Sequence, residues 1–93
     1  METATKKKEE TKSVVPSGPN KLVLHNDDFN TLEWVANCLI DVCHHTFEQA
    51  EQCTLIVHHK GKCDVKVGDE STLKEMKTEL LIRQLSVTIE RNG

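Results

Sequence analysis

Asn26, Asp27 and Asp28 place an amide and two carboxylates side by side, directly after an apolar run and directly before an apolar helical pattern. Carboxylate and amide oxygens together suit a cation, and an ammonium group has three donors to offer them. The alternative is an Asx-type turn, because Asn and Asp side chains satisfy local backbone amides. Calcium fits poorly, since the stretch lacks the spread ligands and glycine bend of an EF-hand loop. The turn and the cation socket both remain open.

Histidines and cysteines form a second group of candidates. His58 follows Thr54 by four residues, so the two share a helix face if the segment is helical; the alternative role for His58 is that of a partly buried structural residue. The pairs at positions 44–45 and 58–59 could assemble a transition-metal site with cysteines. No two cysteines have CxxC spacing, so we expect no metal and no cofactor. Without a secretion signal the four thiols should stay reduced and not form disulfides. They belong to Cys38, Cys43, Cys53 and Cys63.

Size and charge narrow the function classes. A chain of 93 residues forms one small domain, in which a large catalytic cleft is not expected. Twelve basic against 15 acidic residues give a formal charge of −3, which disfavours nucleic acid as a partner. We find neither 18 consecutive apolar residues nor an N-terminal apolar signal region, so we expect no membrane contact and a cytoplasmic location.

The first half of the chain predicts a tail, a strand and two helices. Residues 1–19 are polar and rich in Pro and Gly near their end, which predicts a flexible tail before a domain over 20–93. Leu22–Leu24 predicts a short strand that stops at Asn26. Asn30 and Glu33 have the form of a capping box, followed by an apolar stripe that ends near His44. The segment 47–59 mixes helical and β-branched features, and its length favours a helix.

The second half predicts a strand, a helix and a strand. Cys63, Val65 and Val67 alternate with polar residues, as in a strand with one buried face. Thr72 and Glu75 form a second capping-box pattern before a third helical stripe, and residues 85–90 alternate again. The order β-α-α-β-α-β indicates an α+β fold of two layers, a three-stranded antiparallel sheet covered on one side by three helices.

Several of these segments resemble the ClpS family, the adaptors that bring N-degron proteins to an AAA+ Clp protease. The resemblance extends over roughly residues 21–90. It rests on four stretches: Val23–Phe29, Leu32–Val35, Ala50 with Leu55–His58 before Gly61, and Val87–Glu90.

The resemblance implies a non-enzymatic adaptor with a pocket between the start of the first helix and one face of the second. The ligand would be a protein whose first residue is Leu, Phe, Tyr or Trp. Three residues would contact its α-amino group: Asn26, Asp27 and His58. The apolar pocket would be lined by Leu32, Val35, Thr54, Val57 and Leu85, with Asp28 and Asn30 at its rim. The implied partners are N-degron substrates and the N-terminal domain of a ClpA- or ClpC-like unfoldase.

The physical chemistry of such a site is consistent with this implication. A free α-amino group has a pKa of about 7.7–8.0 and is mostly a cation at neutral pH, unlike an internal amide. Burying a Leu or Phe side chain contributes roughly 1.5–3 kcal/mol, and Ala contributes much less. A negative socket beside an apolar pocket would therefore recognise two features of one terminal residue.

The sequence also departs from the family pattern. Leu32 and Thr54 stand where relatives usually carry methionines, which suggests a wider pocket that changes the ranking of first residues or admits Ile. The region from Gly61 to Gln84 is shorter than usual, and Gln84 replaces a proline, which leaves the partner ATPase open. Two other functions remain as alternatives: a metal-binding or redox domain, and a general interaction domain without N-terminal specificity.

Overall fold

The computed structural model describes residues 18–92 and contains three strands and three helices. Most of the tail predicted over residues 1–19 therefore lies outside the described residues. The sheet has the central strand β2 (Asn20–His25) between two antiparallel neighbours, β3 (Lys62–Gly68) and β4 (Ser86–Arg91). The helices are α1 (Leu32–Cys43), α2 (Phe47–Lys60) and α3 (Glu70–Ile82). The predicted element order and the α+β class are confirmed.

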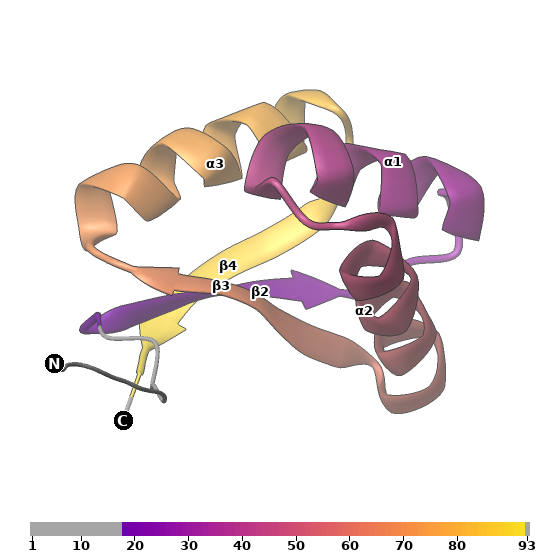
Figure 1. Cartoon of the computed structure of the whole chain (residues 1–93), viewed down its shortest axis with the longest axis horizontal. Helices are drawn as coiled ribbons and strands as arrows, with labels where there is room; N and C mark the ends of the chain where they lie inside the picture. The colour runs from indigo at the N-terminus through magenta and orange to yellow at the C-terminus, as the bar shows by residue number, and fades with distance from the viewer. Residues whose placement is uncertain (1–17, 93) are drawn as a thin grey trace, which may run out of the picture.

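The helices cover one face of the sheet and form the second layer (Figure 1). Figure 1 shows α1 lying between α3 and α2, with the strands passing below α3 and α1 and with α2 beside the sheet, where it packs on β3. The apolar stripes that predicted the helices supply the core, because they face the inner side chains of the central strand. The largest fully buried core side chains come from both layers: Leu22, Leu24, Leu39, Leu73 and Leu80.

A bulge in β3 breaks the alternation predicted for Cys63, Val65 and Val67. Leu22 pairs with Lys66 while Val23 pairs with Asp64, so Val65 is an extra residue in the edge strand. Lys66 therefore lies on the helix side, where its Nζ donates to the carbonyl of Cys43 at 3.2 Å. The predicted strand exists, but its period-2 pattern changes phase at the bulge.

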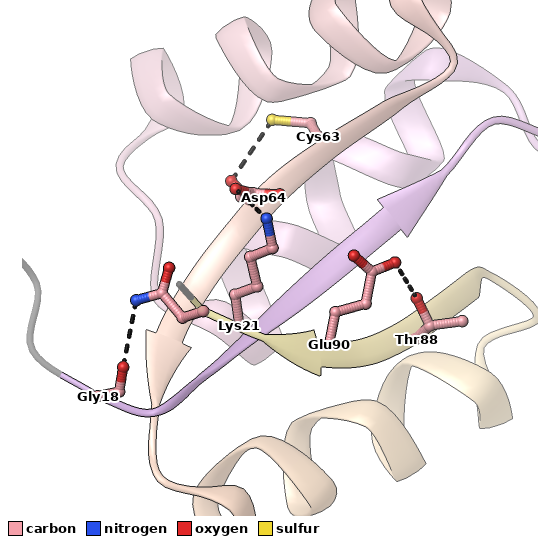
Figure 2. Close-up of polar contacts among 7 residues, drawn as sticks. Gly18, Lys21, Cys63, Asp64, Thr88 and Glu90 are labelled. Carbon is pink, nitrogen blue, oxygen red and sulfur yellow. Dashed lines mark hydrogen bonds and ion pairs between the residues drawn. The ribbon is translucent and has the colours of Figure 1, made fainter.

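The open face of the sheet carries polar contacts (Figure 2). Lys21 Nζ lies 3.3 Å from Asp64 Oδ2 in the adjacent strand, and Thr88 Oγ1 donates to Glu90 Oε2 at 3.4 Å. These exposed pairs contribute little stability, because solvent screens them.

Two of the predicted helix caps are wrong by one and three residues. The N-cap of α1 is Thr31, whose hydroxyl accepts from the Trp34 amide, and not Asn30. The N-cap of α3 is Asp69 and not a residue of the 72–75 pattern. The capping box that does form, between Thr46 and Gln49 at the start of α2, uses Gln at its third helical position. Each observed cap residue accepts the backbone N–H three residues later through its side-chain oxygen.

Candidate functional site

The segment between β2 and α1 folds as a turn around one carboxylate. Asp27 Oδ1 accepts the backbone N–H groups of Phe29 at 2.9 Å and Asn30 at 2.8 Å, and Oδ2 accepts the Asn30 side-chain amide at 3.1 Å. The first of these bonds is that of an Asx turn. The turn interpretation is therefore confirmed. It also fixes the carboxylate in one orientation.

Asp27 is held in its ionised form. Its partial burial raises the pKa, but the hydrogen bonds from the Asn30 backbone, the Asn30 side chain and the Phe29 backbone outweigh burial, so the net pKa is lowered. Hydrogen bonds to the charged form favour that form. Three accepted bonds leave a carboxylate with about one further acceptor position. A fixed negative charge with spare acceptor capacity therefore lies just before α1.

Asn30 connects this turn to the segment between α3 and β4. Its side-chain Nδ2 donates to the backbone carbonyl of Gln84 at 2.8 Å as well as to Asp27. One turn of helix later, Trp34 Nε1 donates to the Arg83 carbonyl at 3.1 Å. The start of α1 is thus tied to the connection between α3 and β4.

The same turn is tied to the end of α2. The Asn26 backbone N–H donates to the Gly61 carbonyl at 2.9 Å. Gly61 ends α2 in a left-handed conformation with φ 94°, and its own N–H donates to Val57. Glycine suits this position because other residues rarely adopt such a φ. The polar turn and the second helix therefore have a fixed relative position.

A small hollow lies where β2, α1 and α2 converge. Its enclosed volume is only about 20 Å³, and it reaches about 290 Å³ when the open mouth is included. Seven of the ten predicted site residues line it, together with the last two residues of β2: Asn26, Asp27, Asn30, Leu32, Val35, Thr54 and Val57, with Leu24 and His25. The carboxylate and amide groups of this lining come from the turn, and its aliphatic side chains come from β2, α1 and α2.

Three predicted residues lie outside this lining. Asp28 is exposed in the turn, and Leu85 is 3% exposed and packs in the core. His58 is exposed on α2, with its ring centroid 5.2 Å from that of His59. Leu24 and His25 also line the hollow, whereas the sequence predicts only the end of a strand at these positions. The strand's end at the polar turn was the available signal for them.

Thr54 is the buried polar residue of the hollow. Its hydroxyl donates to the Ala50 carbonyl at 2.7 Å, one turn earlier in the same helix. This satisfies the hydroxyl without a ligand. Thr54 is therefore a short wall residue, and Asp27 is the one carboxylate among the described residues that line the hollow.

The cysteines do not form a second site. No group of three His, Cys, Asp or Glu residues within positions 18–92 could hold a metal ion. Burial raises the pKa of Cys43 to about 11, and burial together with a hydrogen bond to Cys53 raises that of Cys63 to about 12. Both thiols are protonated at neutral pH, whereas metal ligation and nucleophilic attack need the thiolate. The metal and redox alternatives gain no support from these residues.

Comparison with known proteins gives a consistent match. Residues 16–88 match the family described as ATP-dependent Clp protease adaptor protein ClpS. The ClpS adapter protein of Nitratidesulfovibrio vulgaris (strain Miyazaki F) is 38% identical over 56 residues, which is 58% of this chain and 56% of that protein. The ClpS adapter protein of Syntrophus aciditrophicus is 32% identical over 66 residues, 69% of this chain and 62% of that protein. The chain thus spans a little over half the length of these relatives.

A solved structure shares the fold. It is that of Agrobacterium tumefaciens ClpS2 bound to L-phenylalaninamide, with a TM-score of 0.75 and 21% sequence identity, covering 84% of this chain and all of that one. At this identity the likeness establishes the fold alone. None of the helices between residues 18 and 92 is long and apolar enough to cross a bilayer.

Proposed function

Because this chain belongs to the ClpS family of Clp protease adaptors, we propose that it binds proteins through their first residue and delivers them to a Clp protease. One observation carries the proposal. An ionised carboxylate, fixed by three hydrogen bonds, lines a hollow whose exposed lining surface is mainly apolar. A charged amino group next to a large apolar side chain is the feature that a protein's first residue presents. The solved relative bound to L-phenylalaninamide carries such a ligand.

The α-amino group is assigned to the polar end of the hollow. Asp27 supplies charge and one spare acceptor position, and the Asn26 side chain supplies an amide oxygen beside it. His58 is proposed as a third contact, because α2 ends at Gly61, which is bonded to Asn26. In this arrangement an internal peptide bond lacks the charge to compete.

The side chain of the first residue is assigned to the apolar end. Leu32, Val35, Thr54 and Val57 line it, Asp28 and Asn30 shape the rim, and the buried Leu85 supports the wall from the core. Leu, Phe, Tyr and Trp each bury enough surface to contribute roughly 1.5–3 kcal/mol, whereas Ala does not. We propose these four residues as the preferred first residues.

The shapes of the wall residues Leu32 and Thr54 bear on which first residues the hollow can accept. Leu32 is branched and 44% exposed, and Thr54 is short, so the entrance is not closed by long side chains. We propose that the hollow also admits the β-branched residue Ile. One methylene more or less in such a pocket changes affinity by about 1–3 kcal/mol.

Delivery requires a second contact, with the unfoldase of the protease. We propose that the chain acts in the cytoplasm as a non-enzymatic adaptor that docks on the N-terminal domain of a ClpA- or ClpC-like unfoldase. In this role the protein supplies binding and positioning, while the ATPase supplies the work of unfolding. The family membership supports this assignment.

The test is fluorescence anisotropy with one labelled peptide in which only the first residue changes. Leu, Phe, Tyr, Trp and Ile should bind, while Ala and Asp should bind at least about tenfold more weakly, the equivalent of about 1.4 kcal/mol. A reporter with the same first residues should then be degraded faster by a Clp protease when this protein is added. Equal affinity for Leu and Asp peptides would show that no first-residue recognition exists.

A further inference from the structure

Residue 84 follows the last turn of α3 in a backbone conformation that few residues adopt. Gln84 has φ 71°, in the left-handed region, although it carries a Cβ. Its N–H donates to the Leu81 carbonyl at 2.9 Å, and the Leu85 N–H donates to the Leu80 carbonyl at 3.0 Å. This pair of bonds is the Schellman motif, whose left-handed position is usually occupied by glycine. Gln84 is therefore held in a conformation that its own Cβ disfavours.

The carbonyl of Gln84 faces the start of α1. Because the left-handed conformation ends the helix, the peptide group after Gln84 turns away from the axis of α3. Its oxygen accepts Asn30 Nδ2 at 2.8 Å, and the preceding carbonyl, of Arg83, accepts Trp34 Nε1 at 3.1 Å. The Gln84 side chain is exposed and makes no hydrogen bond within residues 18–92. Gln84 therefore contacts the start of α1 through its backbone.

We propose that Gln84 is a positioning residue for first-residue recognition, an inference that rests on the proposed function. The bond that its carbonyl accepts fixes the side-chain amide of Asn30, whose Nδ2 also donates to Asp27 Oδ2 at 3.1 Å. An amide nitrogen has two N–H bonds, so each of them has one of these two partners. The backbone conformation of residue 84 thus determines how Asn30 meets the carboxylate that is assigned to the α-amino group.

The bond from Asn30 reaches the carboxylate oxygen with the most remaining acceptor capacity. Asp27 Oδ1 already accepts two backbone N–H groups of the turn, at 2.9 and 2.8 Å. Oδ2 accepts only the Asn30 amide among residues 18–92, so the position for a ligand donor lies on this oxygen. If the Gln84 carbonyl turned away, the Asn30 amide would lose one of its two partners and hold Oδ2 less firmly. The contact with an ammonium group would weaken, while the aliphatic wall of the hollow would stay in place.

The experiment measures, by fluorescence anisotropy, how tightly the full chain binds one Leu-first peptide with a free and with an acetylated N-terminus. The ratio of the two affinities isolates the charge contact, because a loss of folded protein lowers both affinities alike. Gln84→Gly and Gln84→Asn adopt the left-handed conformation readily and should keep the wild-type ratio. Gln84→Val resists this conformation and should lower the ratio at least about fivefold. Gln84→Ala, which is less disruptive to the fold, should give a ratio between those of the glycine and valine variants.

The matched control is His44, which ends α1 with φ 61° and is outside the lining of the hollow. His44→Val should lower thermal stability as Gln84→Val does, yet it should leave the affinity ratio unchanged. In an Asn30→Ala background, Gln84→Val should change the ratio by less than about twofold, because Asn30 transmits its effect. If the ratio follows thermal stability in all variants, or if Gln84→Val lowers it equally in both backgrounds, the inference is overturned while first-residue recognition stands. If wild type binds both peptides equally, the proposed function fails and the inference falls with it.

Discussion

The backbone N–H of Asn26 donates to the carbonyl oxygen of Gly61 at 2.9 Å, which joins the polar turn before α1 to the residue that ends α2. The two residues are distant in sequence, yet this bond sets the distance between the carboxylate end of the hollow and one of its helical walls. Recognition of a first residue depends on that distance. The helix end at Gly61 is therefore part of the site's framework.

Gly61→Ala should test this framework. A Cβ at Gly61 would meet no atom within 4 Å, so the cost comes only from the positive φ of 94°. That cost is about 1–2 kcal/mol of unfolding free energy. Urea denaturation should show the loss, and peptide affinity should fall with it because the end of α2 shifts. A stability loss with unchanged affinity would show that the Asn26 contact does not position the site.

Protonation of Asp27 should destabilise the fold at acid pH. Hydrogen bonds lower its pKa below the ordinary value of 3.8, so it is more acidic in the folded than in the unfolded chain. Its stabilising contribution is present above about pH 4 and is lost as the pH falls through the folded pKa. Urea melts between pH 2 and 5 should therefore show a steeper loss for wild type than for Asp27→Asn. Parallel curves would contradict the bonding described for this carboxylate.

Thr54→Met should narrow the range of first residues. The longer side chain would fill part of the hollow next to Leu32, which should penalise a β-branched first residue more than an unbranched one. We expect the ratio of Ile to Leu affinity to fall about tenfold, with anisotropy as the measurement. Thr54→Val keeps the shape of the side chain and should keep the ratio. A wild-type protein that already rejects Ile as strongly as Ala would refute the wider pocket.

Thr31→Ala should cost more helix stability than Asn30→Ala. Thr31 caps α1 through the Trp34 amide, and loss of such a cap costs about 0.5–2 kcal/mol. Asn30 instead joins Asp27 to Gln84, so its loss should affect peptide affinity more than the helix. Circular dichroism during thermal unfolding, combined with anisotropy on both variants, separates the two effects. The reverse ranking would restore Asn30 as the cap.

The helices, the strands and much of the polar turn could be predicted from the sequence, because both kinds of feature depend on local patterns. The apolar stripe of α1, the length of α2 and the Asx preference of Asp27 are visible within a few residues. The caps of α1 and α3 were misplaced since several residues nearby could fill the role. The hydrogen bond from Asn30 to Gln84 spans 54 residues, so no local pattern reveals it.

Features that depend on tertiary packing could not be predicted from the local sequence pattern. The bulge at Val65 appears only in the pairing of β3 with β2, and it moves Lys66 to the helix side. A groove lined by residues of both helices likewise lies where α1 and α2 meet. Phe47 and Glu51 lie one turn apart on α2, whereas Glu33 comes from α1 and shows no common motif with them. Their shared location is a property of the fold.

The most direct test of the central proposal compares one Leu-first peptide with its N-acetylated form by fluorescence anisotropy. Acetylation removes the positive charge and leaves the side chain unchanged, so the contribution of Asp27 is isolated. Losing one partner of a desolvated charge pair costs about 2–5 kcal/mol, so the acetylated peptide should bind at least about thirtyfold more weakly to wild type. Asp27→Asn should bind both forms weakly and nearly equally. Equal binding of the free and acetylated peptides to wild type would contradict the proposal.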